Sequence, residues 1–278
     1  MKVIVNVDDA GLHPAVRRGI ETLSEAGIVT SATVMANGPD LDEALKLKGV
    51  GLGVHLNILR GRPVSPWQEV HTLVDRSTGL FLGDYTTLFT RFLAGRIDME
   101  QVELEWGRQV DRILKAGVVP THVDSEKHIH AWPAMTAAAG RVARRYGIGW
   151  MRRPVECAGL TRLDKGGIRT KFLRLCSLFQ RRPQGMAWPD SIWGIADQGA
   201  NLTPDRFRKA MAGRRFDIVE ICCHPGLSLP GDPPISPDYG AMRVASQWQD
   251  ELEALSDPEW LAMFRDIGAE LVHFGHLR

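Results

Sequence analysis

The stretch Val3-Ile4-Val5-Asn6-Val7-Asp8 joins a β-branched apolar run to a polar end. Its apolar side chains stand at adjacent positions, and adjacent residues of a strand point to opposite faces of the sheet. A strand that is apolar on both faces fits a sheet covered by helices, as in parallel α/β proteins. The stretch therefore predicts a buried strand of an α/β fold.

Short apolar runs and longer amphipathic stretches alternate along the rest of the chain. The predicted strands are Val3–Asp8, Ser31–Asn37, Gly51–Asn57, Thr121–Asp124, Gly149–Arg152, Ser191–Ile195, Asp217–Cys223 and Glu270–Phe274. The predicted helices are Ala15–Ala26, Asp40–Lys46, Thr86–Ala94, Met99–Ala116, Ala134–Arg145, Pro204–Ala212 and Pro258–Ile267. The βα order favours a parallel sheet, and about eight strands favour a (β/α) barrel formed by one domain over residues 1–278. An open doubly wound sheet is the alternative, although no Gly-x-Gly-x-x-Gly turn opens the first helix.

Composition argues against several classes of protein. The 278 residues carry a formal net charge of +1, which gives no global attraction to nucleic acid. No apolar run approaches the roughly 18–20 residues of a membrane span, and the N-terminus does not resemble a signal peptide, so we expect a cytoplasmic protein. The four cysteines, Cys157, Cys176, Cys222 and Cys223, lack metal-binding spacing and are interpreted as core thiols without a chemical role.

A second stretch, Thr121–His130, concentrates groups that bind metals or transfer protons. Five of them stand at even positions: His122, Asp124, Glu126, His128 and His130. In an extended segment they would share one face, which predicts an active site; a solvated polar loop is the alternative. Fully extended they would span about 27 Å at roughly 3.3–3.4 Å per residue, so only one or two can reach one metal ion. The others would orient substrate, support the ligands or bond to backbone.

Polar residues also stand where other predicted strands end. Asp8-Asp9 follows the first strand, His55-Leu56-Asn57 ends the third, Arg152 ends the fifth, and Glu220 and His224 frame the end of the seventh. Reactive groups of α/β folds gather at the carboxyl ends of strands. Adjacent aspartates there point apart, so one can hold a metal ion while the other accepts a proton. We therefore expect a divalent ion that activates water.

Six motifs follow one another along the chain: Asn6–Gly11, Ile28–Thr33 with Asn37-Gly38, Gly53–Asn57, Thr121–His130, Arg152–Glu156 and Glu220–Gly226. In this order they resemble the motifs of the YdjC-like carbohydrate deacetylases, the group of chitooligosaccharide deacetylase and the hopanoid-biosynthesis deacetylases. The resemblance covers nearly the whole chain. It implies an irregular TIM-like barrel, often a homodimer, that uses one divalent metal ion to remove acetyl groups from N-acetylated sugars.

The resemblance also implies roles for individual residues. Asp9 and His55 would bind the metal, and Asp8 would act as general base. The third ligand of the family is a histidine, whereas this chain has Glu126 at that position. A carboxylate can ligate Mg²⁺ or Zn²⁺, and the more anionic site would favour harder ions. His128 is the reserve ligand.

His224 is our hypothesis for the acid that releases the amine, and Arg152 would orient Asp8 or bind substrate. The residues expected to bind substrate or to support the ligands are Asn57, Asp124, His128, His130, Arg152 and Glu220. Two other functions stay open. One is a different metal-dependent hydrolase, such as an amidohydrolase or phosphoesterase, and the other is a sugar-binding paralogue that has lost catalysis through Glu126.

Residues 162–182 form a basic amphipathic stretch that has no acidic residue after Asp164. The apolar residues among its cations are Ile168, Phe172, Leu173, Leu175, Leu178 and Phe179. Such a stretch is typical of a segment that lies on an anionic membrane surface or near a lipid-linked glycan, and an ordinary solvated helix face is the alternative. The resemblance implies an N-acetylated sugar, and with this stretch the expected substrate is an oligosaccharide, glycolipid or lipid-linked glycan that bears one.

Overall fold

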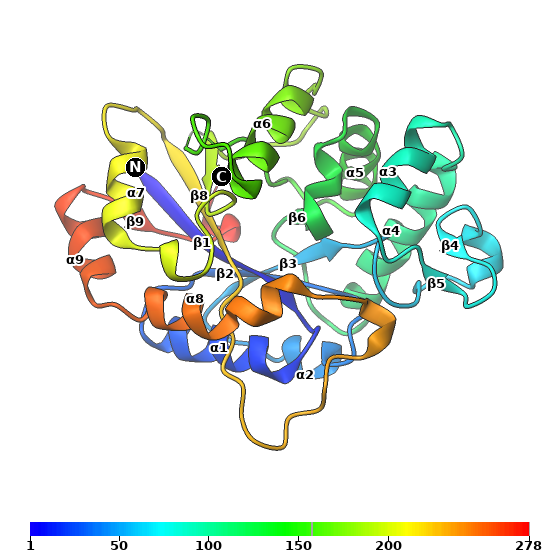
Figure 1. Cartoon of the computed structure of the whole chain (residues 1–278), viewed down its shortest axis with the longest axis horizontal. Coiled ribbons are helices and arrows are strands. Elements are labelled where there is room, and N and C mark those ends of the chain that lie inside the picture. The colour runs from blue at the N-terminus through cyan, green and yellow to red at the C-terminus, as the bar shows by residue number, and fades with distance from the viewer. Residues whose placement is uncertain (157, 278) are drawn as a thin grey trace.

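A curled sheet of parallel strands lies at the centre of the computed structural model, which describes residues 1–156 and 158–277 (Figure 1). Its strands are β1 (Lys2–Ala10), β2 (Ser31–Val34), β3 (Gly51–Leu56), β6 (Val123–Ser125), β7 (Ser191–Trp193), β8 (Ile218–Cys223) and β9 (Glu270–Leu271). They are ordered β6-β3-β2-β1-β8-β7, and β9 pairs with the start of β1. The predicted parallel α/β sheet is confirmed, while the core thiol predicted at Cys157 lies outside the described residues.

Residues 150–156 span the gap between β6 and β7 without forming a continuous strand. Three isolated parallel bridges are made here: Val123 with Met151, Trp150 with Ala187, and Glu156 with Ile192. Pro154 has no N–H to donate to a ladder, which is a physical reason for the interruption. The prediction of a strand at Gly149–Arg152 is therefore wrong. In the part of the chain that the structure describes, the sheet is a curled half-barrel and the predicted barrel is confirmed only to that extent.

Helices surround the curled sheet (Figure 1). They are α1 (Pro14–Glu25), α2 (Leu41–Ala44), α3 (Tyr85–Leu93), α4 (Met99–Lys115), α5 (Pro133–Arg145), α6 (Lys165–Ser177), α7 (Pro204–Met211), α8 (Trp248–Leu255) and α9 (Glu259–Asp266). The longest of them, α4, buries Val102, Trp106, Val110 and Ile113 at helical spacing. Asp98 caps its first turn by accepting a backbone N–H. Among the described residues, no helix combines the length and the apolar composition that a membrane span requires.

The structure contains elements that the sequence pattern does not predict. Two are the helices α6 and α8, and a third is the antiparallel pair of β4 (Val74–Asp75) and β5 (Leu80–Phe81). Gly166 and Gly167 stand at the start of α6, and glycine lowers helix propensity. Tertiary contacts override that local preference, because Leu173 of α6 is buried.

The stretch Thr121–His130 leaves the extended conformation soon after its strand begins. β6 ends at Ser125, and Glu126–Ala131 form a 3₁₀ turn. Within this turn Lys127 and His128 have φ values of 53° and 54°, in the left-handed region. The prediction that five even-numbered groups share one face is therefore wrong beyond β6, because the turn redirects the side chains that follow it.

Candidate functional site

β1 ends in a bulge that turns two neighbouring aspartates toward one cavity. Its pairing with β2 shifts register between Val7 and Ala10, and Asp9 has a left-handed φ of 64°. In a regular strand Asp8 and Asp9 would point to opposite faces, and a bulge re-aims one of them. Both line the same cavity, although Asp8 contacts Arg152 and Asp9 lies beside His55. Burial and the nearby Glu126 raise the pKa of Asp9 to about 6.

Asp9, His55 and Glu126 form a buried group at the ends of β1 and β3 and just after β6. One ligand atom from each residue lies within 4.8 Å of the other two. His55 Nε2 is 3.3 Å from Asp9 Oδ1 and 3.6 Å from Glu126 Oε2. Asp9 Oδ1 is buried and makes no hydrogen bond within the described residues. A buried carboxylate oxygen that lacks a partner, beside a histidine and a second carboxylate, fits a divalent cation.

Asp124 fixes the orientation of His55. Its Oδ1 lies 2.7 Å from His55 Nδ1, and its Oδ2 accepts the hydroxyl of Thr33 at 3.0 Å. A carboxylate on one ring nitrogen leaves the other nitrogen, Nε2, facing Asp9 and Glu126, an arrangement common in histidines that bind metals. Burial by itself lowers the pKa of His55, but Asp124, Glu126 and Asp8 together outweigh it and raise that pKa well above its ordinary value.

Arg60, which the sequence analysis does not single out, pairs with Glu126. Its Nε donates to Glu126 Oε1 at 2.5 Å, and its Nη1 donates to the carbonyl oxygen of Tyr239 at 2.6 Å. Burial raises the pKa of Glu126, but His55, Lys127 and Arg60 together lower it below its usual range. Glu126 is therefore an ionised carboxylate with one oxygen bound to Arg60 and the other near His55.

Arg152 is fully buried and joins three carboxylates. It donates to the two oxygens of Asp8 at 2.6 and 2.7 Å and to Glu220 at 2.8 Å, and it lies 2.7 Å from Asp124 Oδ2. Burial raises the pKa of Asp8, but the charge and hydrogen bonds of Arg152 lower it well below its ordinary value. Burial raises the pKa of Glu220 to about 7. One guanidinium thus fixes Asp8 directly and His55 through Asp124.

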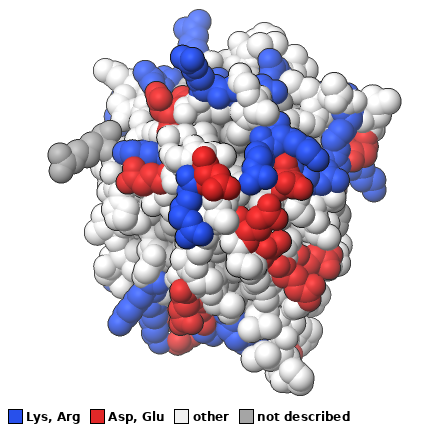
Figure 2. All heavy atoms as spheres, turned by 90° about the vertical axis from the view of Figure 1, so that its left-hand side faces the viewer, with Lys and Arg blue, Asp and Glu red and all other residues white. Residues whose placement is uncertain are grey.

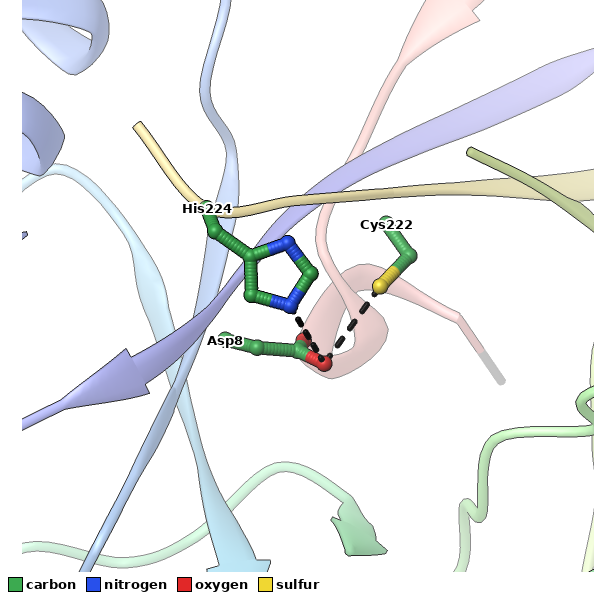
Figure 3. A group of neighbouring side chains, drawn as sticks. All are labelled: Asp8, Cys222 and His224. Atoms are coloured by element: carbon green, nitrogen blue, oxygen red, sulfur yellow. Dashed lines mark hydrogen bonds and ion pairs between the residues drawn. The ribbon is translucent and has the colours of Figure 1, made fainter. Parts of the chain in front are cut away.

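Asp8 also faces two side chains from the end of β8 (Figure 3). His224 Nε2 lies 3.9 Å from Asp8 Oδ2, and Cys222 Sγ donates to the same oxygen at 3.3 Å. Glu251 of α8 accepts the backbone N–H of His224 at 2.5 Å and lies 3.7 Å from its Nδ1. Burial lowers the pKa of His224, but Glu251 and Asp8 raise it above its ordinary value. Cys222, interpreted from the sequence as a core thiol without a role, contacts the site.

Two further groups of the described residues are compact enough for a metal ion but less suited to one. They are Asp8 with Cys222 and His224, and Asp8 with His55 and Asp124. Both include Asp8, whose two oxygens already accept hydrogen bonds from Arg152. A cation bound there would meet the guanidinium charge at close range. The group of Asp9, His55 and Glu126 is therefore the best candidate metal site in the described chain.

The site opens into a cavity of about 290 Å³ with two kinds of wall. One wall is polar and comes from the strand ends and the turn after β6. The other wall is largely apolar and is formed by Tyr85, Ile168, Phe172, Leu173, Met242 and Val244. Three of these belong to α6, so the basic amphipathic segment of the sequence forms part of the cavity.

The predicted histidines of the Thr121–His130 stretch separate in the structure. His122 Nε2 lies 3.2 Å from Asn6 Oδ1, and His130 Nδ1 lies 2.6 Å from Ser125 Oγ. Both rings are buried, and neither lines the cavity. His128 does line the cavity, and its buried Nδ1 has no hydrogen-bond partner within the described residues. Only His128 of the three is therefore in reach of a bound molecule.

Asn57 and Glu220 lie behind the cavity. Asn57 Oδ1 accepts the backbone N–H groups of Leu59 and Arg60 at 2.9 and 3.0 Å, which shapes the turn that carries Arg60. Glu220 is fully buried beside Arg152. Each residue contacts one of the two arginines that hold the carboxylates of the site.

Sequence reasoning missed several residues of the site. Arg60 stands three positions after Asn57, so following the chain one turn beyond the strand-end motif would have drawn attention to it. Glu251 carried no signal, because α8 itself is not predicted. Tyr85 was assigned to no site, since an aromatic residue near a helix start is most often part of the core.

The fold and the site together define an α/β protein with a metal-compatible group at the carboxyl ends of its strands. More narrowly, the chain belongs to the YdjC-like family: the family described as YdjC-like protein matches residues 2–266. A carbohydrate deacetylase of Clostridium beijerinckii is 27% identical over 278 residues, with 99% of each chain covered. A carbohydrate deacetylase of Mus musculus is 28% identical, covering 98% of this chain and 93% of the relative.

The fold also matches a crystal structure from Enterococcus faecalis V583, described as a putative cellobiose-phosphate cleavage protein. Its TM-score is 0.71 at 23% identity, and the match covers 99% of this chain and 98% of that one. At this identity the likeness concerns the fold alone.

Proposed function

We propose that the protein is a metal-dependent hydrolase that removes the acetyl group from an N-acetylated sugar. The observation that carries the proposal is the buried group of Asp9, His55 and Glu126 beside Asp8 in one cavity. Relatives named carbohydrate deacetylase, which align over nearly the full chain, support the substrate class. One divalent ion, Mg²⁺ or Zn²⁺, would polarise the acetamide carbonyl when bound to these three residues.

Asp8 is the group proposed to accept the proton of the attacking water. Its two hydrogen bonds from Arg152 fix the carboxylate in one orientation, as a general base requires. The water oxygen bonds to the carbonyl carbon, and the C–N bond then breaks. His224, 3.9 Å from Asp8, is the proposed acid that protonates the departing amine. The products are acetate and a sugar with a free amine.

The apolar wall of the cavity supports a sugar that bears an apolar carrier. Phe172 and Leu173 of α6, with Met242 and Val244, offer contacts suited to a hydrocarbon rather than to a second sugar ring. We therefore propose a glycolipid or lipid-linked glycan in preference to a free oligosaccharide. The homodimer and the cytoplasmic location expected from the sequence stay predictions.

Metal analysis combined with product analysis tests the proposal. The protein is stripped with a chelator, reloaded with Mg²⁺ or Zn²⁺, and incubated with N-acetylglucosamine oligomers and with alkyl N-acetylglucosaminides. We expect acetate and amine in equal amounts, loss of both on chelation, and a lower KM for the alkyl glycosides.

Two variants sharpen the test. Asp8→Asn should lower kcat by roughly 10²–10⁴-fold with metal content unchanged, as loss of a general base predicts. Asp84→Asn, at the exposed cap of α3, is the matched control and should keep full activity. If the protein binds one equivalent of metal per chain but releases no amine from any N-acetyl sugar, the proposed deacetylation is wrong. Failure to bind any divalent metal would favour the non-catalytic sugar-binding alternative.

A further inference from the structure

Helix α6 and its flanks carry most of the large apolar side chains that are exposed on the described chain. Eight such residues are exposed, and five of them fall within residues 163–179: Leu163, Ile168, Leu175, Leu178 and Phe179. Single exposed apolar residues are ordinary, whereas a cluster of them marks a surface that contacts a partner.

Two of the exposed apolar residues share one face of α6, and two more continue the same spacing past its end. Ile168 and Leu175 are seven positions apart, and Leu178 and Phe179 follow after three and four more, which is helical spacing. Leu178 still has helical dihedrals, with φ of −65° and ψ of −24°. Leu173 points the other way and is buried. The exposed stripe is therefore the outward face of an anchored helix, which we call the α6 face.

Cations border the α6 face. Residues 165–182 contain six Lys or Arg and no Asp or Glu. Arg181 and Arg182 line a surface hollow of about 340 Å³ together with Arg141 and Arg144. Arg141 pairs with Glu103, while the other three have no ion-pair partner within the residues that the structure describes. The hollow therefore offers several exposed guanidinium groups to a negatively charged ligand.

The excess of cations over carboxylates is local to one end of the surface that Figure 2 shows. Figure 2 shows Lys and Arg interspersed with Asp and Glu over one side of the molecule. Lys and Arg predominate along the upper edge of that view, the end at which α6 lies in Figure 1. With a net charge of +1, the whole chain gives no general attraction to anions, so the attraction would be local to this end.

We propose that the α6 face docks on an anionic lipid bilayer. Its apolar stripe would lie at the boundary between headgroups and acyl chains, and the arginine hollow would contact lipid phosphates. A second copy of the chain fits this surface less well, because a two-fold interface would set the same cations against one another. The combination of an apolar stripe with bordering cations is complementary to an anionic membrane.

Docking through α6 would bring the cavity to the membrane surface. Lys165, Ile168 and Phe172 of the same helix line the cavity, and Ile168 is also exposed. The docking proposal rests on this surface alone and not on the proposed deacetylation. Vesicle binding and amine release are separate measurements, so either proposal can fail while the other stands.

Vesicle co-sedimentation tests the docking with the full chain. Vesicles of phosphatidylcholine with one third phosphatidylglycerol are compared with pure phosphatidylcholine at low and high NaCl. We expect binding to the anionic vesicles that weakens with salt, because salt screens exposed charges. Arg181→Ala with Arg182→Ala should weaken binding about fivefold for each arginine. Leu178→Asp with Phe179→Asp should weaken it at least tenfold, in line with loss of apolar insertion.

Matched variants at surface positions outside the α6 face control for general effects of the substitutions on vesicle binding. Val119→Asp changes an apolar residue that is 79% exposed in the loop before β6, and Lys48→Ala with Lys115→Ala removes two exposed cations. These variants should bind as the unmodified chain does. Absence of binding to anionic vesicles at low salt, or equal loss in the controls, would overturn the proposal. The surface would instead be assigned to a second copy of the chain by two results together. The protein would sediment as a dimer that dissociates on Leu178→Asp with Phe179→Asp, and it would not bind vesicles.

Discussion

Replacing Arg152 with methionine should destabilise the protein more than any surface substitution. The side chain is fully buried, and it contacts Asp8, Asp124 and Glu220. Methionine keeps much of the volume but removes the only charge that these carboxylates share through direct contact in the described chain. Leaving buried charges uncompensated is one of the few single changes that costs several kcal/mol.

The magnitude follows from how the three carboxylates respond. Glu220, whose pKa is about 7, can take up a proton at neutral pH and escape most of the cost. Asp8, whose pKa Arg152 holds well below the ordinary value, loses both of these hydrogen bonds and is left buried either as an unpaired charge or as a protonated acid, and each state costs free energy. Removing one partner of a buried pair typically costs about 3–5 kcal/mol, and the total stability of a domain is about 5–15 kcal/mol. We expect a loss of about 3–5 kcal/mol.

Urea unfolding in chelator-containing buffer measures this loss without a contribution from bound metal. Arg141→Met breaks an exposed pair with Glu103 and should cost only about 0–1 kcal/mol. If Arg152→Met does not fold, Arg152→Lys keeps the charge without the two-pronged geometry and should show an intermediate loss. An Arg152→Met protein within about 1 kcal/mol of the unmodified chain would refute the reasoning.

The pH dependence gives a second check on the same variant. In the unmodified chain the lowered pKa of Asp8 contributes stability above the ordinary aspartate pKa, and this stability is lost as the pH falls. Without Arg152, burial raises the pKa of Asp8 in the folded state above its unfolded value. The folded variant then binds protons that the unfolded chain does not, so its stability should fall as the pH rises from about 5 to 8. A cost that grows toward acid pH would contradict this account.

Two further predictions concern contacts of the site, and a third concerns a buried carboxylate outside the cavity. Glu251→Gln removes a carboxylate that raises the pKa of His224, so the alkaline limb of the pH profile of kcat should move to lower pH. An alkaline limb that does not move would contradict the role of His224 as the acid. Glu126→His, combined with Arg60→Met so that no guanidinium is left unpaired, should raise the ratio of Zn²⁺ to Mg²⁺ affinity at least tenfold, measured by competition titration. Glu156→Ala removes the acceptor of three backbone N–H groups, at residues 194, 195 and 196, and of the Thr170 hydroxyl. Urea unfolding should show a loss of roughly 2–3 kcal/mol.

The parallel sheet explains why so much of the site can be predicted from local patterns. Its strands end at one edge, so polar residues placed after separate apolar runs meet there. The predicted strand Gly51–Asn57 differs from β3 by one residue, and His55 is on it in both. Asp9, His55 and Glu126 lie close together because their strands end at the same edge of a parallel sheet, and the repeated βα pattern already indicates such a sheet.

Features that depend on local backbone geometry or on distant contacts could not be predicted. The bulge at Asp8 and Asp9 and the left-handed turn at Lys127 arise where the chain stops pairing, and alternation rules fail there. The pairing of Arg60 with Glu126 joins residues 66 positions apart, which no local pattern encodes. The segment of α6 stands out in the sequence by its basic and apolar composition. It is not predicted as a helix, because its glycines lower the local helix propensity.

The contact between Arg60 and Glu126 changes what the glutamate means for the metal. Counted alone, Asp9 and Glu126 give the site a charge of −2, against −1 for one aspartate with two neutral histidines. Arg60 adds +1 within hydrogen-bond distance of Glu126, so the three residues together carry −2 + 1 = −1. With Arg60 counted, the net charge equals that of one aspartate with two neutral histidines, and greater negative charge no longer explains a preference for hard ions. Any such preference must come from the oxygen donor itself, which suits Mg²⁺ better than an imidazole nitrogen does.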